Sequence, residues 1–183
     1  VGAGYLAAAA GWSHTLALKT DGTPWVWGSN SYGELGDGGT IDRNTPVVVG
    51  AGCCAVAAGP RQTLAVNSDG RLWAWGASYF QDDAGSNSVN PTKVGEAYSK
   101  VAAGFNFNLA LKTDGSLWAW GDNQYGQLGD GTRTNRSSPV LIGTGYAAIA
   151  TGGKHGLARK NDGTVWAWGW NASGQLGDGT TTQ

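Results

Sequence analysis

Methionine is absent from this 183-residue sequence, and cysteine and charged residues are scarce. Charged side chains make up only 14% of the chain and the formal net charge is −1. We therefore expect no nucleic-acid partner, because binding a phosphate backbone requires a basic surface. No run of 18 apolar residues occurs, and we expect no membrane span. The chain starts at Val1 and not at Met, from which we expect a mature, trimmed or excised piece.

The two cysteines, Cys53 and Cys54, are adjacent, so their spacing predicts no disulfide framework. We interpret them as ordinary thiols on a strand, with a vicinal disulfide or a reactive pair as the alternative. Two Cys and two distant His are too few for a zinc site. The Asp-Gly turns at Asp37, Asp130 and Asp178 lack the closely spaced oxygen ligands of a calcium site. We expect no metal and no cofactor.

Sequence motifs of catalysis are missing as well. Neither a Gly-x-Ser-x-Gly elbow nor a His-Glu-x-x-His helix occurs. His14 and His155 stand at the same place in an internal repeat, where the other two copies have Gln62 and Phe107. A single catalytic histidine is not indicated by that pattern, and we predict a protein that is not an enzyme.

What the sequence does contain is one stretch repeated four times, in which Asp-Gly precedes Trp-x-Trp-Gly. The closing glycines are spaced by 48, 45 and 48 residues, at Gly28, Gly76, Gly121 and Gly169. A period near 48 is typical of solenoids and propellers. We expect a single repeat array over residues 1–183. Its units span residues 5–52, 53–97, 98–145 and 146–183, and the last is incomplete because residues 136–141 have no counterpart in it.

Each unit predicts four short strands. In the third unit the first two are expected at residues 100–104 and 108–112. An Asp-Gly pair then predicts a tight hairpin, since both turn positions tolerate positive φ. The third strand covers residues 117–120, and the fourth contains Pro139, which suits a sheet edge because proline donates no ladder hydrogen bond. No segment has helical periodicity, so the fold class is all-β.

The repeated Trp-x-Trp pairs predict the core of such a fold. On a strand the two indoles point to one face, while the small residue between them lets the next sheet approach on the other face. We favour core packing over sugar or base stacking because the positions are the same in all four units. The residues concerned are Trp25, Trp27, Trp73, Trp75, Trp118, Trp120, Trp166 and Trp168.

The repeated motifs resemble a known family. The first unit shows them in order: His14–Lys19, Asp21-Gly22, Trp25–Gly28, Asn30, Gly33–Gly36 and residues 43–47. This sequence pattern is similar to the regulator-of-chromosome-condensation repeat. The motifs Trp-Ala-Trp-Gly and Gly-Gln-Leu-Gly-Asp-Gly-Thr resemble its bacterial branch. The resemblance covers nearly the whole chain. It implies a β-propeller of four-stranded blades, usually seven, and a binding role, since members include a nucleotide-exchange factor and a secreted β-lactamase inhibitor.

Four units are too few for an ordinary closed ring. The chain is then a part of a longer seven-bladed ring, or a half-propeller, two copies of which close an eight-bladed ring. Open ends that keep adding subunits are the third possibility, because unpaired strand edges pair readily with another chain.

Positions that differ between the units, on loops, are where we expect a binding surface for another protein. Drift in tolerant loops is the alternative. Arg43 and Arg136 are expected to pair with the turn carboxylates. The predicted partner-binding positions are Trp12, His14, Arg61, Gln62, Tyr79, Phe80, Phe105, Phe107, Asp122, Lys154, His155 and Trp170.

We predict a non-enzymatic propeller that binds proteins through loops on one face. The first alternative is self-association through open repeat ends, into a ring or a filament. The second is polysaccharide binding by the exposed aromatics Trp12, Trp170, Tyr79 and Phe80. Low charge, few cysteines and abundant Gly, Thr, Asn and Trp favour an exported, secreted protein.

Overall fold

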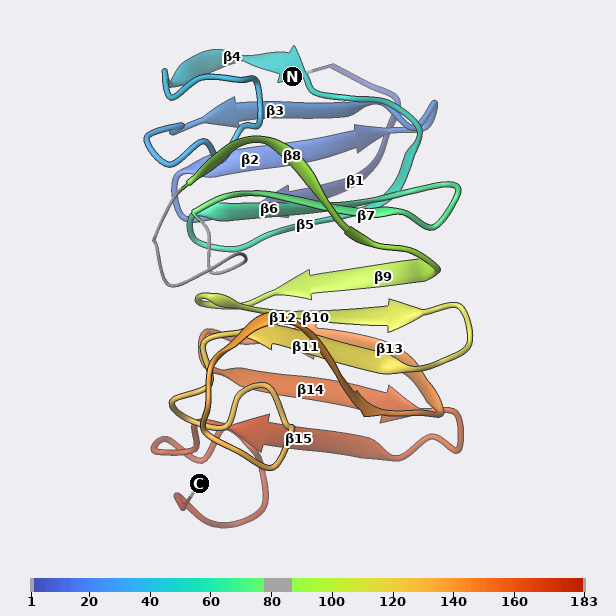
Figure 1. Cartoon of the computed structure of the whole chain (residues 1–183), viewed down its shortest axis with the longest axis vertical. Coiled ribbons are helices and arrows are strands. Elements are labelled where there is room, and N and C mark those ends of the chain that lie inside the picture. The colour runs from blue at the N-terminus through green and yellow to red at the C-terminus, as the bar shows by residue number, and fades with distance from the viewer. Residues whose placement is uncertain (1, 78–86, 183) are drawn as a thin grey trace.

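The computed structural model describes residues 2–77 and 87–182, and within them fifteen strands form four antiparallel sheets (Figure 1). We call the sheets blades one to four in chain order. Blade one contains β1 (Tyr5–Ala10), β2 (His14–Lys19), β3 (Pro24–Gly28) and β4 (Arg43–Val48). Blade two contains β5 (Cys53–Ala58), β6 (Gln62–Asn67), β7 (Leu72–Gly76) and β8 (Ser88–Gly95). Blade three contains β9 (Tyr98–Ala103), β10 (Phe107–Lys112), β11 (Leu117–Gly121) and β12 (Arg136–Gly143), and blade four contains β13 (Tyr146–Thr151), β14 (His155–Lys160) and β15 (Val165–Gly169). The all-β prediction is confirmed.

The Asp-Gly hairpins form as predicted. In blade three the Gly115 N–H donates to the Lys112 carbonyl at 3.1 Å, and the Lys112 N–H donates to the Ser116 carbonyl at 2.9 Å. The φ of Gly115 is +78°, a value that residues with a Cβ rarely adopt. The Asp114 carboxylate accepts the Ser116 N–H at 2.9 Å and fixes the turn from outside. This chemistry joins β10 to β11 and recurs in the other blades.

The fourth strands β4, β8 and β12, each of which contains a proline, lie at the edge of their sheets, again as predicted. Blade four has only the three strands β13, β14 and β15 among the described residues. That agrees with the missing counterpart of residues 136–141 in the fourth unit.

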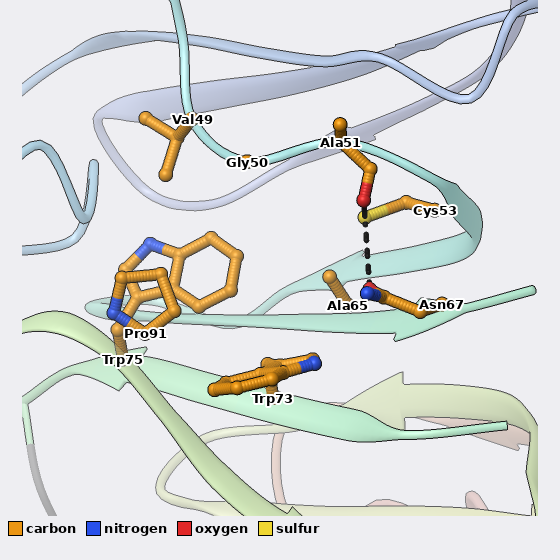
Figure 2. A pocket seen from close by; sticks show the side chains of 9 residues that line it. All are labelled: Val49, Gly50, Ala51, Cys53, Ala65, Asn67, Trp73, Trp75 and Pro91. Carbon is orange, nitrogen blue, oxygen red and sulfur yellow. Dashed lines mark hydrogen bonds between the residues drawn. The ribbon is translucent and has the colours of Figure 1, made fainter. Parts of the chain in front are cut away.

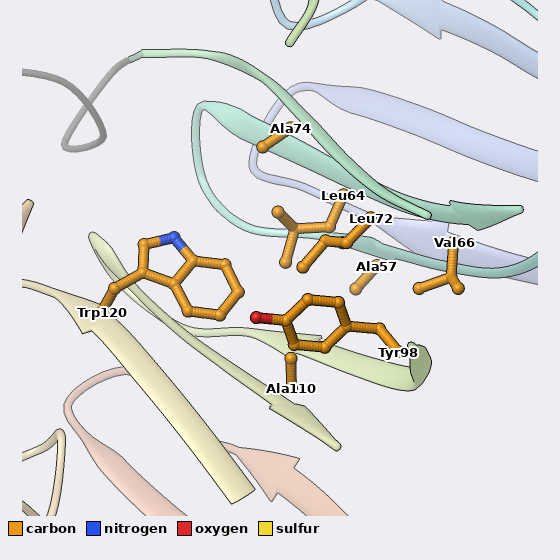
Figure 3. Packing of buried hydrophobic residues seen from close by; sticks show 8 residues of the cluster. All are labelled: Ala57, Leu64, Val66, Leu72, Ala74, Tyr98, Ala110 and Trp120. Atoms are coloured by element: carbon orange, nitrogen blue, oxygen red, sulfur yellow. The ribbon is translucent and has the colours of Figure 1, made fainter. Parts of the chain in front are cut away.

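The blades stack with their sheets face to face, from blade one at the top of Figure 1 to blade four at the bottom. Trp120 of β11 is fully buried against Leu64, Leu72 and Ala74 of blade two, as Figure 3 shows. Ala119, between the two indoles, is also fully buried but belongs to the cluster shared with blade four. On β11 the large indole therefore faces the preceding blade and the small Ala119 faces the following blade, which confirms the interdigitation predicted for the Trp-x-Trp pattern.

The predicted tryptophan core is correct in part. Trp75 and Trp120 are buried, with 3% and 0% of their surface exposed. Trp166 is 51% exposed, and its prediction as a core residue is wrong in this chain. Its counterpart Trp118 lies opposite Leu141 of β12, whereas β15 has no fourth strand beside it among the described residues. The remaining members of the pairs are half-buried: Trp25, Trp27, Trp73, Trp118 and Trp168.

In blades one, three and four the glycine-rich turn after the third strand is held by a buried asparagine, Asn30, Asn123 or Asn171. Asn123 is fully buried, and its side-chain amide donates to the Asp130 carboxylate at 3.0 Å and to two backbone carbonyls. Asp130 in turn pairs with Arg136 at 2.7 Å, and Asp37 pairs with Arg43 at 2.6 Å, as predicted. Burial acts to raise the pKa of Asp130, but hydrogen bonds from Thr132, Arg136 and Asn123 outweigh it and hold that pKa at about 2.

Candidate functional site: an aromatic and cationic loop face

One end of the stack gathers the loops before the second strand of all four blades and, within residues 2–77 and 87–182, the loops after the third strand of blades one, three and four. Because strand direction alternates, the loop before the second strand and the loop after the third strand meet at the same end, on the left in Figure 1. Backbone hydrogen bonds tie the two loops of one blade together, as between the Trp170 N–H and the Lys154 carbonyl at 2.9 Å. Another bond links neighbouring blades, from the Phe105 N–H to the Gly153 carbonyl at 2.8 Å. The loop face is therefore a fixed surface.

The side chains of blades one and two meet on this face around Arg61. Its guanidinium lies 4.3 Å from the ring centre of Tyr32 and 5.9 Å from that of Trp12. Trp12 is 64% exposed. Beneath Tyr32 lies buried Glu34, whose carboxylate accepts the Tyr32 N–H at 2.8 Å. Burial and the nearby Asp42 raise the pKa of Glu34, and the positive charge of Arg61 acts against them.

The same surface continues over blades three and four. The rings of Trp12 and Phe105 meet edge to face with centres 5.2 Å apart. The Lys154 ammonium lies 6.0 Å from the Phe105 ring centre and 4.5 Å from that of Tyr125. Tyr125 then meets Trp170 at 6.4 Å. Aromatic and cationic side chains thus form one continuous series of contacts across all four blades, which we call the loop-face band: Tyr32, Arg61, Trp12, Phe105, Lys154, Tyr125 and Trp170.

The structure brings together five of the predicted partner-binding residues in this band: Trp12, Arg61, Phe105, Lys154 and Trp170. Two members were missed, Tyr32 and Tyr125. Both stand two residues after the buried turn asparagine, and because the first and third units share tyrosine there, the repetition indicated scaffold. The signal that distinguishes them is the fourth unit, which has Ser173 at the same place.

Three other predicted residues lie elsewhere, and their prediction as loop contacts is wrong. His14, Gln62 and Phe107 are the first residues of β2, β6 and β10, and they are 3%, 2% and 0% exposed. Their side chains face the next blade. Gln62, for example, donates to the Phe107 carbonyl of blade three at 3.4 Å. These positions differ between units because each side chain contacts a different residue of the next blade.

His14 shows what such a position does. Its Nε2 atom lies 3.0 Å from the Thr63 hydroxyl, and that hydroxyl donates to the Glu34 carbonyl at 2.8 Å. Thr63 is therefore the acceptor for His14, which places the proton on Nε2. Burial lowers the pKa of His14 to about 4, so the imidazole is neutral at physiological pH. The residue holds two blades together.

The remaining predicted residues are placed as follows. His155 starts β14 and is half-buried on the outer face of blade four. The Asp122 carboxylate accepts the Gln124 N–H at 3.2 Å and shapes its own turn. Tyr79 and Phe80 lie outside the described residues.

In the part of the chain that the structure describes, no three His, Cys, Asp or Glu side chains lie close enough together to hold a metal ion. Cys53 and Cys54 are free thiols, which agrees with the interpretation as ordinary thiols. Across residues 2–77 and 87–182, no helix has the length and apolar character needed to cross a membrane.

Four blades with a shared loop face define a β-propeller protein of the interaction-scaffold type. A model of the regulator of chromosome condensation (RCC1) repeat matches residues 21–66 and 114–159, and a second model of the same repeat matches residues 7–34, 98–127 and 146–175. The chain belongs to the RCC1 repeat family, which confirms the resemblance read from the sequence. Membership of the bacterial branch stays a prediction.

Solved structures agree with this family. Human WBSCR16 superposes with a TM-score of 0.86 and 26% identity, over 98% of this chain and 51% of that one. Prp20p of Saccharomyces cerevisiae, whose binding to Gsp1p and histones has been studied, superposes with a TM-score of 0.83 and 28% identity. The match covers 94% of this chain and 46% of Prp20p. The ultraviolet-B receptor UVR8 of Arabidopsis thaliana is 46% identical over 39 residues, which are 21% of this chain and 9% of that protein. The chain thus spans about half the length of WBSCR16 and of Prp20p.

Proposed function

We propose that this chain is a non-enzymatic scaffold whose loop-face band binds an acidic segment of another protein. The observation that carries the proposal is the unbroken series of contacts from Tyr32 to Trp170 across four blades. A surface fixed by backbone hydrogen bonds loses little conformational entropy when a partner binds.

The chemistry of the band suits protein recognition. Tryptophan, tyrosine and arginine are the residue types that dominate binding energy at protein interfaces. Arg61 and Lys154 are its two cations, and each lies against aromatic rings that hold it in place. A partner that places carboxylates beside these cations and an apolar side chain against Trp12 satisfies both kinds of contact.

The experiment is a selection of displayed random peptides on the purified chain, followed by affinity measurements on the selected peptides. We expect enrichment of Asp and Glu around an apolar residue. The variant Arg61→Ala should weaken binding about tenfold or more, as for a charged hot spot. The matched control is Arg71→Ala, which removes an exposed arginine from the β6–β7 turn at the other end of blade two and should leave affinity unchanged.

Peptides that bind both variants as tightly as the native chain would place the binding surface elsewhere and overturn the proposal. If no peptide is enriched, and if the native chain binds glycans on an array that the Trp12→Ala variant does not bind, the band would be a polysaccharide-binding surface.

Self-association is the second candidate, favoured by the outer faces of the end blades. Val165 is 68% exposed on the outer face of blade four. Its counterpart in blade three, Leu117, is fully buried because blade four covers it. His155 lies there at the position of His14, and Thr15 on the outer face of blade one lies at the position of Thr63. A second copy placed with His155 against Thr15 would repeat the contact between blades one and two. Further blades of a longer chain would fill the same faces.

Light scattering of this polypeptide tests that candidate. A mass of twice 18.8 kDa that falls to one chain mass in His155→Asp would support closure by two copies. A single-chain mass for the native polypeptide would contradict self-association without touching the loop-face proposal.

A further inference from the structure

A cavity of about 200 Å³ lies between blades one and two, away from the loop-face band (Figure 2). Its wall is mostly apolar, with Trp73 and Trp75 of β7 on one side and Val49 on the other. Among the described residues the lining also includes Cys53, Ala65 and Asn67.

The cavity exists because blade two departs from the repeat at two paired positions. In blade three, the Lys112 ammonium lies 5.1 Å from the Tyr98 ring centre and 4.5 Å from that of Trp118. Blades one and four have the same triad, with Lys19 between Tyr5 and Trp25, and Lys160 between Tyr146 and Trp166.

In blade two, Cys53 replaces the tyrosine and Asn67 replaces the lysine, and the two face each other across β5 and β6. A thiol and a short amide leave the space of a phenol ring and an alkyl chain unfilled. Among the described residues, no cation covers Trp73, unlike the first indole of the other three pairs.

The chemistry of the wall limits what fits. A cavity of about 150 Å³ lined by apolar side chains holds a benzene ring, so this one has room for a single ring with a small substituent. The Cys53 thiol donates to the side-chain oxygen Oδ1 of Asn67 at 3.4 Å. The side-chain NH₂ group of Asn67 is then left to donate to a ligand oxygen. Burial raises the pKa of Cys53 to about 11, so the thiol is protonated at neutral pH and does not act as a nucleophile.

We propose that this cavity is a binding site for small neutral aromatic molecules of the phenol class. The ring lies where the other blades have a tyrosine ring, against Trp73, and its polar substituent accepts a hydrogen bond from Asn67. The site is independent of the loop-face band and of any protein partner.

The experiment titrates the native chain with p-cresol, observed by saturation-transfer NMR on the ligand. We expect saturable binding with a dissociation constant on the order of 0.1 to 1 mM, as befits eight non-hydrogen atoms. The double variant Cys53→Tyr with Asn67→Lys restores the repeat residues and should abolish the binding. The aliphatic analogue 4-methylcyclohexanol should bind at least tenfold more weakly, because it lacks the flat ring.

Two further variants keep the test decisive. Ala65→Leu narrows the cavity from one side and should also abolish binding if the double variant fails to fold. Tyr98→Cys with Lys112→Asn transfers the blade-two pair to blade three, and a second binding equivalent is expected. Absence of saturable p-cresol binding to the native chain up to about 10 mM would overturn the proposal. Unchanged binding to a folded, cavity-filled variant would overturn it as well.

Discussion

The Nε2 atom of His14 lies 3.0 Å from the hydroxyl oxygen of Thr63, and this contact joins blade one to blade two. Gln62 and Asn108 hold the same two positions at the next interface, where Gln62 also bonds to backbone carbonyls of blade three. The first two interfaces between blades therefore use matched polar pairs as well as apolar packing, whereas Phe107 and Gly156 hold these positions at the third. Since both partners of such a pair are buried, water cannot replace the hydrogen bond between them.

The His14 contact makes stability depend on pH. The unfolded imidazole takes up a proton near pH 6.5, whereas the folded one does so only near pH 4. Between those values the unfolded chain binds more protons, so the free energy of unfolding falls as pH drops from 6.5 to 4. We expect His14 to contribute about 3 kcal/mol to that fall.

Urea denaturation of the native chain and of His14→Gln across this range measures the effect. Glutamine is the residue that blade two uses at this position, and it does not titrate. The difference between the two curves isolates His14 from carboxyl groups such as Glu34. Parallel curves for the two proteins would show that His14 does not titrate in this way.

Asn123 is expected to be essential for the turn after β11. Replacing it with Ala leaves the Leu128 N–H and the Thr132 and Thr134 carbonyls without their partner. We expect a loss of about 2 to 4 kcal/mol in the free energy of unfolding, since the buried Leu128 N–H and two part-buried carbonyls lose hydrogen bonds at once. Gln124→Ala, at an exposed position in the same turn, should change stability by less than about 0.5 kcal/mol. Equal effects of the two substitutions would contradict this role.

The two kinds of tryptophan position should differ sharply in energy. Trp120→Ala removes a fully buried indole from the interface of blades two and three, and about 3 to 5 kcal/mol of stability should be lost. Trp166→Ala, at a position 51% exposed, should cost about 1 kcal/mol or less. Thermal and chemical unfolding of both variants checks the contrast. A large cost for Trp166 would mean that another copy or segment covers it in solution.

The sequence was sufficient to predict the sheets, hairpins and edge strands, because Asp114-Gly115 and Pro139 impose local backbone geometry that needs no knowledge of the neighbours. The loop-face band was only partly predictable. Trp12 touches Phe105 of blade three, and no local pattern reveals such a contact across blade two. Variation between units was misleading at His14. The residue at this position changes with the residue that it contacts in the next blade, and not with an external ligand.

The cavity beside Trp73 had a readable signal in the sequence. Cys53 and Asn67 depart from a tyrosine and a lysine that the other three units share, and the strand register pairs these two positions. Comparison of the units identifies the substitutions, but only the structure shows that they leave a space.

The loop-face band is tested most directly by calorimetric titration of one selected acidic peptide into three proteins: the native chain, Trp12→Ala and Trp166→Ala. Both variants remove an exposed tryptophan, but only Trp12 belongs to the band. We predict that Trp12→Ala weakens the affinity by about 30-fold, as loss of a hot-spot aromatic does, and that Trp166→Ala leaves it within about twofold. Equal affinities for all three proteins would contradict the assignment of the binding surface to the loop face.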